Sequence, residues 1–138
     1  MSLLEIHGTR DPIVPYRGGG IVDDGGEVLG VEATARLWAK ADRCRPDYIE
    51  VPVPDRTAQG GCYPQGFEWC DGKHGTDVVL YRIIGGGHTW PGSQLGFPSS
   101  LFLGKVCLDF DASELIWKFF WEHPKIQRRR ESNEPGKH

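Results

Sequence analysis

The chain has 138 residues, of which 38% are hydrophobic and 25% are charged, and its formal net charge is -3. This length and composition are typical of one globular domain. Its acidic balance provides no basic field for DNA or RNA, so we expect no nucleic-acid partner. No stretch approaches the roughly 20 apolar residues of a membrane-spanning helix, and residues 1–16 lack the basic and long apolar regions of a signal peptide, so we expect no membrane insertion and find no export signal.

The first predicted strand is a short apolar segment, residues 3–8, which ends in a glycine turn and is followed by Asp11. Residues 17–29 are rich in glycine and acid and predict a surface loop. An apolar stripe at helical spacing then predicts a helix from Val31 to about Arg43, with Gly30 as its N-cap. The predicted stripe consists of Val31, Ala35, Trp38 and Ala41.

The middle of the chain predicts a peripheral hairpin. Residues 48–53 alternate in polarity and contain Pro52, which restricts them to an edge strand. Residues 55–61 predict a turn, and residues 67–70 predict the returning strand.

The segment of residues 78–92 is the most informative in the sequence. Residues 78–84 are apolar except for Arg82 and predict a strand buried on both faces of a parallel sheet. Three glycines follow and permit a sharp turn that presents His88 at the carboxyl end of this strand. In an open α/β sheet this is the edge where ligands bind, and histidine is suited to proton transfer near neutral pH. Two strands therefore present an aspartate, Asp11, and a histidine.

The last third of the chain predicts a loop and a helix. Residues 91–104 form an irregular loop with scattered apolar side chains, which either line a pocket or pack on the domain. Asp111 is a good N-cap for a helix that ends before Pro124. Residues 124–138 predict a disordered basic tail. The broad apolar face expected on this helix consists of Leu115, Ile116, Phe119 and Phe120, widened by Trp117 and Trp121.

Three motifs together resemble the carboxyl-terminal part of the polyhydroxybutyrate depolymerase and feruloyl esterase family. They are the segment from His7 to Tyr16, the Gly-Gly-Gly-His-Thr-Trp-Pro-Gly run of residues 85–92, and the helix start at residues 111–120. The resemblance covers roughly residues 3–123. It implies a partial α/β-hydrolase fold, namely the last strands and helices of a mostly parallel sheet, with a domain over residues 1–123 and the tail of residues 124–138.

The same resemblance implies a secreted or periplasmic serine esterase that hydrolyses polyhydroxyalkanoate or feruloyl-carbohydrate esters. Asp11 would orient the imidazole of His88, and His88 would exchange a proton with the nucleophilic serine. Trp90 and Tyr16 would contact the substrate.

One essential part of such an enzyme is not found in the sequence. The nucleophile of this fold lies on a Gly-x-Ser-x-Gly turn, and none of the six serines has glycines two residues away on both sides. We therefore expect a fragment, a truncated product or one half of a split enzyme. Alone it would be inactive or nearly so, and its partner would be an N-terminal half that carries the serine. The absence of a signal peptide fits a piece of a longer exported precursor.

The four cysteines do not have the paired short spacing of a zinc ribbon. A disulfide fits their glycine-rich surroundings, and buried free thiols are the alternative. The family resemblance implies a disulfide between Cys44 and Cys70. It leaves the pairing of Cys62 and Cys107 open.

Two other interpretations remain. A non-catalytic module could hold a ligand in a cleft formed by Tyr16, Trp90 and Phe97. A metal could instead bind His7, Asp11, His74 and His88, although their spacing matches no common ligand pattern. We expect no metal and no cofactor.

Overall fold

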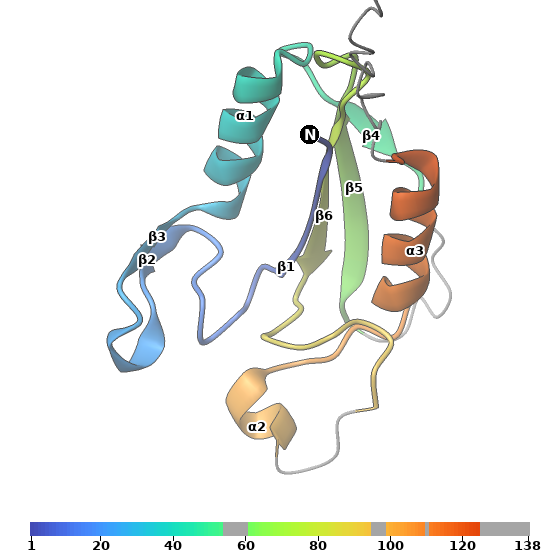
Figure 1. The fold of residues 1–138 in the computed structure, drawn as a ribbon. Coiled ribbons are helices and arrows are strands. Elements are labelled where there is room, and N and C mark those ends of the chain that lie inside the picture. The colour runs from blue at the N-terminus through green and yellow to red at the C-terminus, as the bar shows by residue number, and fades with distance from the viewer. Residues whose placement is uncertain (54–60, 95–98, 110, 125–138) are drawn as a thin grey trace, which may run out of the picture.

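A mixed sheet with one helix on each face forms the centre of the chain, as the computed structural model describes it for residues 1–53, 61–94, 99–109 and 111–124 (Figure 1). The chain therefore has mixed α/β content, as the sequence predicted. In spatial order the four strands are β1 (Leu3–Gly8), β6 (Val78–Ile84), β5 (Tyr63–Trp69) and β4 (Ile49–Val51).

The sheet has one parallel pair and two antiparallel pairs. β1 runs parallel to β6, with Leu3 opposite Val78 and Gly8 opposite Ile83. β6 pairs with β5, and β5 pairs with the edge strand β4, both antiparallel. The predicted peripheral hairpin is confirmed, and because it is added beside β6 the described sheet is mixed, with one parallel pair in place of a mostly parallel arrangement.

The central strand β6 is buried on both faces, which confirms the prediction for residues 78–84. Val78 and Leu80 pack with helix α1 (Val31–Asp42), while Val79 and Ile83 belong to the core beneath helix α3 (Ala112–Glu122). Alternate side chains of a strand point to opposite faces, so β6 contributes to both cores.

Helix α1 begins after the N-cap Gly30, as predicted, but it buries a different stripe. Ala35 is fully buried and Ala39 is nearly so, whereas Trp38 is 39% exposed and Ala41 is also exposed. The two small alanines, four residues apart, allow the helix backbone to approach the sheet closely, and the larger indole lies to the side.

Helix α3 begins at the predicted N-cap, because Asp111 accepts hydrogen bonds from the backbone N–H groups of Ser113 and Glu114. Only part of the broad apolar face predicted for it is buried, because Leu115, Ile116 and Phe119 are at least partly covered while Phe120 is 62% exposed. Ala112 and Phe119 are buried and Leu115 is half-buried, while Trp117 and Trp121 are 71% and 79% exposed. A single narrow line of this helix thus faces the sheet.

The remaining elements are short. Residues 17–29, predicted as a loop, contain a small hairpin of β2 (Gly18–Gly20) and β3 (Glu27–Leu29) around a 3-10 turn, Val22–Asp24. The predicted irregular segment contains helix α2 (Ser99–Leu103). Most of the predicted turn of residues 55–61, Phe97, and residues 125–138 of the predicted tail lie outside the described residues. Among the helices that are described, none has the length and apolar character needed to cross a membrane.

Candidate active site

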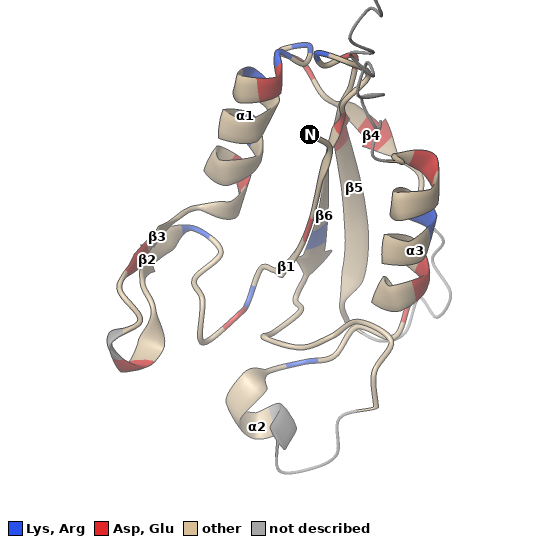
Figure 2. Ribbon diagram, viewed as in Figure 1, with Lys and Arg blue, Asp and Glu red and all other residues tan. Residues whose placement is uncertain are grey.

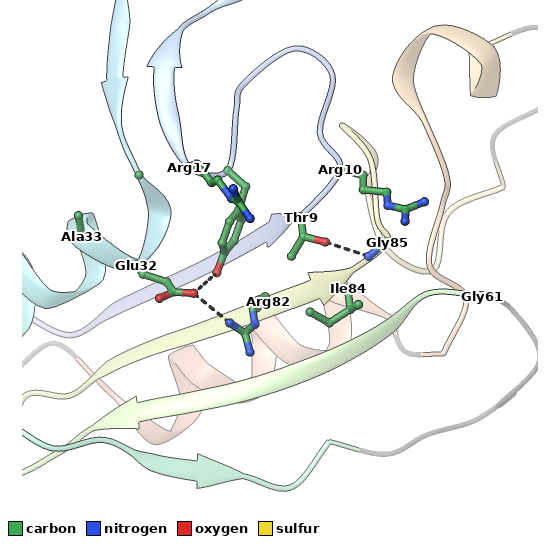
Figure 3. A pocket seen from close by; sticks show the side chains of 11 residues that line it. Thr9, Arg10, Arg17, Glu32, Ala33, Gly61, Arg82, Ile84 and Gly85 are labelled. Atoms are coloured by element: carbon green, nitrogen blue, oxygen red, sulfur yellow. Dashed lines mark hydrogen bonds and ion pairs between the residues drawn. The ribbon is translucent and has the colours of Figure 1, made fainter.

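The turns that follow β1 and β6 are bonded to each other at the carboxyl end of the parallel pair. The backbone N–H of Thr9 donates to the carbonyl of Ile83 at 2.9 Å, and that of Arg10 donates to Gly86 at 2.9 Å. In return, the N–H of Gly85 donates to the Thr9 hydroxyl at 2.9 Å (Figure 3). The two turns therefore form one unit.

Two glycines permit this arrangement. Gly85 ends β6 with a φ of +77°, a conformation that glycine adopts without steric cost. Gly8 ends β1 so close to the second turn that a Cβ atom on it would collide with the carbonyl oxygens of Gly86 and Gly87. The sequence signal of glycine runs at two strand ends thus corresponds to a close backbone approach.

The structure brings the two predicted catalytic side chains together. Nδ1 of His88 lies 2.9 Å from Oδ2 of Asp11, across 77 residues of sequence. The predicted contact is confirmed, while the catalytic role of the pair stays a prediction. The loop after β1 shows adjoining basic and acidic positions near the end of β6 (Figure 2).

Hydrogen bonds fix the orientation of the Asp11 carboxylate. Its Oδ1 accepts from the backbone N–H groups of Ile13 and Val14, both at 2.8 Å, and its side chain is only 5% exposed. These two donors leave Oδ2 to the His88 ring. Because a carboxylate accepts, Nδ1 is the protonated nitrogen in this contact. Nε2 then carries the lone pair on a ring whose side chain is 48% exposed.

Nε2 of His88 has no hydrogen-bond partner among the residues with a described position. The backbone of His88 is held by a 2.6 Å hydrogen bond from its N–H to the carbonyl of Leu103. A rigid backbone, an oriented ring and an accessible basic nitrogen are the features required of a general base.

His7 is a neighbour of this pair, and its sequence context suggested only a metal ligand. Its Nε2 lies 3.9 Å from Oδ2 of Asp11, and its ring lies edge-on to Tyr16 at 5.8 Å. The signal in the sequence was its place four residues before Asp11, across the glycine turn. Asp11 is thus flanked by two imidazoles, of which only His88 is at hydrogen-bonding distance.

A cavity of about 750 Å³ adjoins the end of the parallel pair. Thr9 and Arg10, from the turn that leads to Asp11, line it with Tyr16 (Figure 3). Ile84 and Gly85, at the end of β6, also line it, but Asp11 and His88 do not. The hydroxyl of Tyr16 donates to Oε1 of Glu32 at 3.1 Å. Burial, followed by the Glu32 charge, raises the pKa of Tyr16 well above its ordinary value.

The other predicted substrate residue, Trp90, is not among the residues lining this cavity. It is 53% exposed, and its indole N–H donates to the hydroxyl of Ser113 at 3.1 Å, at the start of α3. Of the three residues of the predicted cleft, Tyr16 lines the cavity, Trp90 does not, and Phe97 lies outside the described residues.

Three arginines that line the cavity were not predicted as functional residues. Arg82 donates to Glu32 at 2.9 Å and to Gln65 at 2.6 Å, whereas Arg10 and Arg17 are exposed and have no partner in the described part of the chain. The available signal was Arg82, the one polar residue in an otherwise apolar strand.

The four cysteines are free thiols in the structure, so the predicted bond between Cys44 and Cys70 is not formed there and stays a prediction. Burial raises the pKa of Cys44, followed by the charges of Asp42, Asp77 and Cys70. Cys62 and Cys107, whose pairing was left open, are neighbours in the core under α3, where the Cys107 thiol donates to the Cys62 carbonyl at 3.4 Å. Burial raises the pKa of Cys107 to about 12.

The predicted metal alternative grouped residues from both ends of the sheet. His7, Asp11 and His88 meet at the carboxyl end, whereas His74 lies in the turn before the amino end of β6.

Comparison with protein-family models, with curated proteins and with solved structures gave no match for this chain. The site is therefore interpreted from its own geometry.

Proposed function

We propose that this chain is the part of a serine esterase that bears the acid and the histidine, of the polyhydroxybutyrate depolymerase and feruloyl esterase type, with a partial α/β-hydrolase fold. The observation that carries the proposal is the 2.9 Å contact between Asp11 and His88 at the carboxyl ends of two adjacent parallel strands. In α/β-hydrolases the acid and the histidine follow the nucleophile in this chain order.

In this proposal each of the two side chains has a separate role. Asp11 holds the proton on Nδ1 and stabilises the imidazolium that forms during reaction. Nε2 of His88 accepts the proton of the serine hydroxyl as that oxygen attacks the ester carbonyl carbon. His88 then returns the proton to the departing alcohol oxygen, and the acyl group stays on the serine until water, deprotonated by the same nitrogen, releases the carboxylic acid.

The nucleophile comes from outside these 138 residues, because no Gly-x-Ser-x-Gly turn occurs in them. The same external part would supply backbone N–H groups to the oxyanion, each worth about 3–4 kcal/mol of transition-state stabilisation. The position of β1 supports this: it is an edge strand of the described sheet although it is parallel and half-buried. Parallel strands are ordinarily covered on both faces and paired on both sides, so β1 suits a further strand.

The test is complementation. The chain is mixed with the N-terminal half of a polyhydroxybutyrate depolymerase that carries the serine turn and ends before the acid-bearing strand. Hydrolysis of p-nitrophenyl butyrate is expected in the mixture and not in either half, and a fluorophosphonate probe is expected to label the serine of the added half. The His88→Ala variant should lose the hydrolysis by on the order of 10⁴-fold or more.

His74→Ala serves as the matched control, because His74 is an exposed histidine at the other end of β6. It should retain the activity of the unmodified mixture. Labelling of a serine in this chain alone, or a His88→Ala mixture as active as the control, would contradict the proposed function.

A second candidate function is a non-catalytic ligand-binding module. The cavity beside Tyr16 favours it, since Arg10 and Arg17 present cationic groups there without partners in the described residues. Such a module would bind a carboxylate or phosphate ligand equally well with His88→Ala. This function would be favoured over the esterase if an anion binds the chain, if Arg10→Ala weakens that binding and His88→Ala does not, and if no complementation is observed.

A further inference from the structure

A second group of chemically active side chains lies at the amino end of β6, at the opposite end of this strand from the Asp11–His88 pair. Glu68 comes from β5, Asp77 directly precedes β6, and His123 caps the carboxyl end of α3. One ligand atom from each residue lies within 4.8 Å of the other two. Glu68 and Asp77 lie on either side of the connection between β5 and β6, whereas His123 comes from the distant end of α3.

Contacts with Phe119, which is not one of these three residues, fix the orientation of the His123 ring. Its Nδ1 lies 2.9 Å from the carbonyl oxygen of Phe119, and its ring stacks on the Phe119 ring with a centroid distance of 4.2 Å. A carbonyl oxygen only accepts hydrogen bonds, so Nδ1 carries a proton. Nε2 of the neutral ring is then a lone pair directed at the sheet.

This lone pair faces a carboxylate. Nε2 lies 3.1 Å from Oδ2 of Asp77, and the two side chains are only 13% and 22% exposed. The other oxygen of Asp77 accepts from the backbone N–H of Asp71 at 3.2 Å, which orients the carboxylate. Two electron pairs in contact repel unless a positive charge lies between them, and that charge is either a second proton on His123 or a metal ion.

We propose that Glu68, Asp77 and His123 bind a Zn²⁺ ion. An imidazole nitrogen with carboxylate oxygens is a donor set that Zn²⁺ uses in proteins, whereas Mg²⁺ and Ca²⁺ prefer oxygen alone. The Nδ1–H bond to a backbone carbonyl is the usual support of a zinc-bound histidine. Burial, followed by the charge of Asp77, raises the pKa of Glu68, and a divalent ion bound between the two carboxylates would offset both effects.

The distances suit this ion after a small closure. Tetrahedral ligands at about 2.0–2.2 Å from zinc lie roughly 3.4 Å apart. The Asp77–His123 separation of 3.1 Å already matches this value. The third ligand atom, on Glu68, can close the remaining gap by rotation of its own side chain, with water as the fourth ligand.

The ion would join α3 to the sheet. This helix buries little of its surface, since Phe119 and Ala112 are its buried residues and its tryptophans are exposed. A metal ion held by its C-cap His123, by Glu68 of β5 and by Asp77 just before β6 would therefore stabilise its position. This inference does not depend on the esterase proposal, because the site lies at the other end of the sheet.

The test is binding of Zn²⁺ alone to the untagged, reduced chain, measured by isothermal titration calorimetry in excess Mg²⁺. One ion per chain and a zinc-dependent rise in Tm are expected. His123→Gln and Asp77→Asn should each weaken binding by at least about 100-fold, because removal of a direct ligand costs more than the loss of a supporting hydrogen bond. Circular dichroism without metal checks that both variants fold, and Glu68→Gln provides a third substitution of nearly unchanged size.

His74→Ala is the matched control and should bind zinc as the unmodified chain does. X-ray absorption of the zinc complex should show nitrogen and oxygen neighbours. Absence of binding, unchanged affinity in His123→Gln and Asp77→Asn, equal weakening in the control, or sulfur neighbours from the free thiols would each overturn the proposal.

Discussion

The two ends of the central parallel pair each hold an aspartate and a histidine, but the histidine is turned differently at each end. At the carboxyl end Asp11 binds Nδ1 of His88, and Nε2 is left accessible. At the amino end a backbone carbonyl binds Nδ1 of His123, and Nε2 points into the Asp77 carboxylate. The first arrangement exposes a basic nitrogen for proton transfer, while the second encloses it beside anionic oxygens.

The difference teaches that an Asp–His contact does not by itself indicate a catalytic pair. Which ring nitrogen meets the carboxylate decides what the other nitrogen can do. The two ends also differ in how they are held together. Backbone groups pack against each other at Gly8, whereas side chains from three elements meet at Asp77.

The largest expected effect of a change at these ends is on catalysis. In the complemented esterase, Asp11→Asn should lower kcat by on the order of 10⁴-fold, because an amide can donate to Nδ1 and thereby favour the wrong tautomer of His88. The exposed Asp47→Asn is the matched control and should leave kcat unchanged. Steady-state kinetics with p-nitrophenyl butyrate measures both, and an Asp11→Asn enzyme as fast as the control would remove the distinction between the two ends.

The next effect concerns the backbone packing of the carboxyl end. Gly8→Ala should lower the free energy of unfolding by about 1–3 kcal/mol, because the new methyl group must displace the carbonyl groups of Gly86 and Gly87. Gly20→Ala is the control, since a Cβ there meets nothing within 4 Å. Urea denaturation followed by tryptophan fluorescence compares the two variants, and equal midpoints would show that the two turns do not pack as described.

The smallest expected effect is on the pH dependence of stability, and it comes from Glu5, a carboxylate in β1 between the two ends. Glu5 lies in β1, its Oε2 is buried without a hydrogen-bond partner in the described structure, and burial raises its pKa to about 7. Between pH 4.5 and 7 the unfolded chain loses this proton while the folded chain keeps it. The Glu5 contribution to stability therefore falls as pH rises through this window.

Glu5→Gln removes this titration, so its Tm relative to the unmodified chain should increase between pH 4.5 and pH 8. The exposed Glu27→Gln should show a constant Tm difference over the same range. Thermal melts at several pH values test this, and a Glu5→Gln difference that stays flat would show that Glu5 does not titrate with a raised pKa in the folded chain.

Local sequence patterns were sufficient for much of the fold and for the candidate active site. The glycine turns after residues 3–8 and 78–84 predicted that Asp11 and His88 would follow two adjacent strands, and the structure places them in contact. Helix starts at Gly30 and Asp111 were also predicted, because capping depends on neighbouring residues. The buried stripe of α1 and the exposed tryptophans of α3 were not, since apolar residues lie around much of each helix and periodicity alone does not tell which side meets the sheet.

The sequence by itself determined the main strands and helices, the glycine turns and the chain order of acid and histidine, because each depends on backbone preferences within a few residues. Only the tertiary structure decided which groups meet across long separations. It placed Arg10 and Arg17 at a cavity, brought Cys62 beside Cys107, and placed His123 beside Glu68 and Asp77. It also decided which nitrogen of each histidine faces a carboxylate, because ring orientation depends on hydrogen bonds and packing from elements that no local pattern connects.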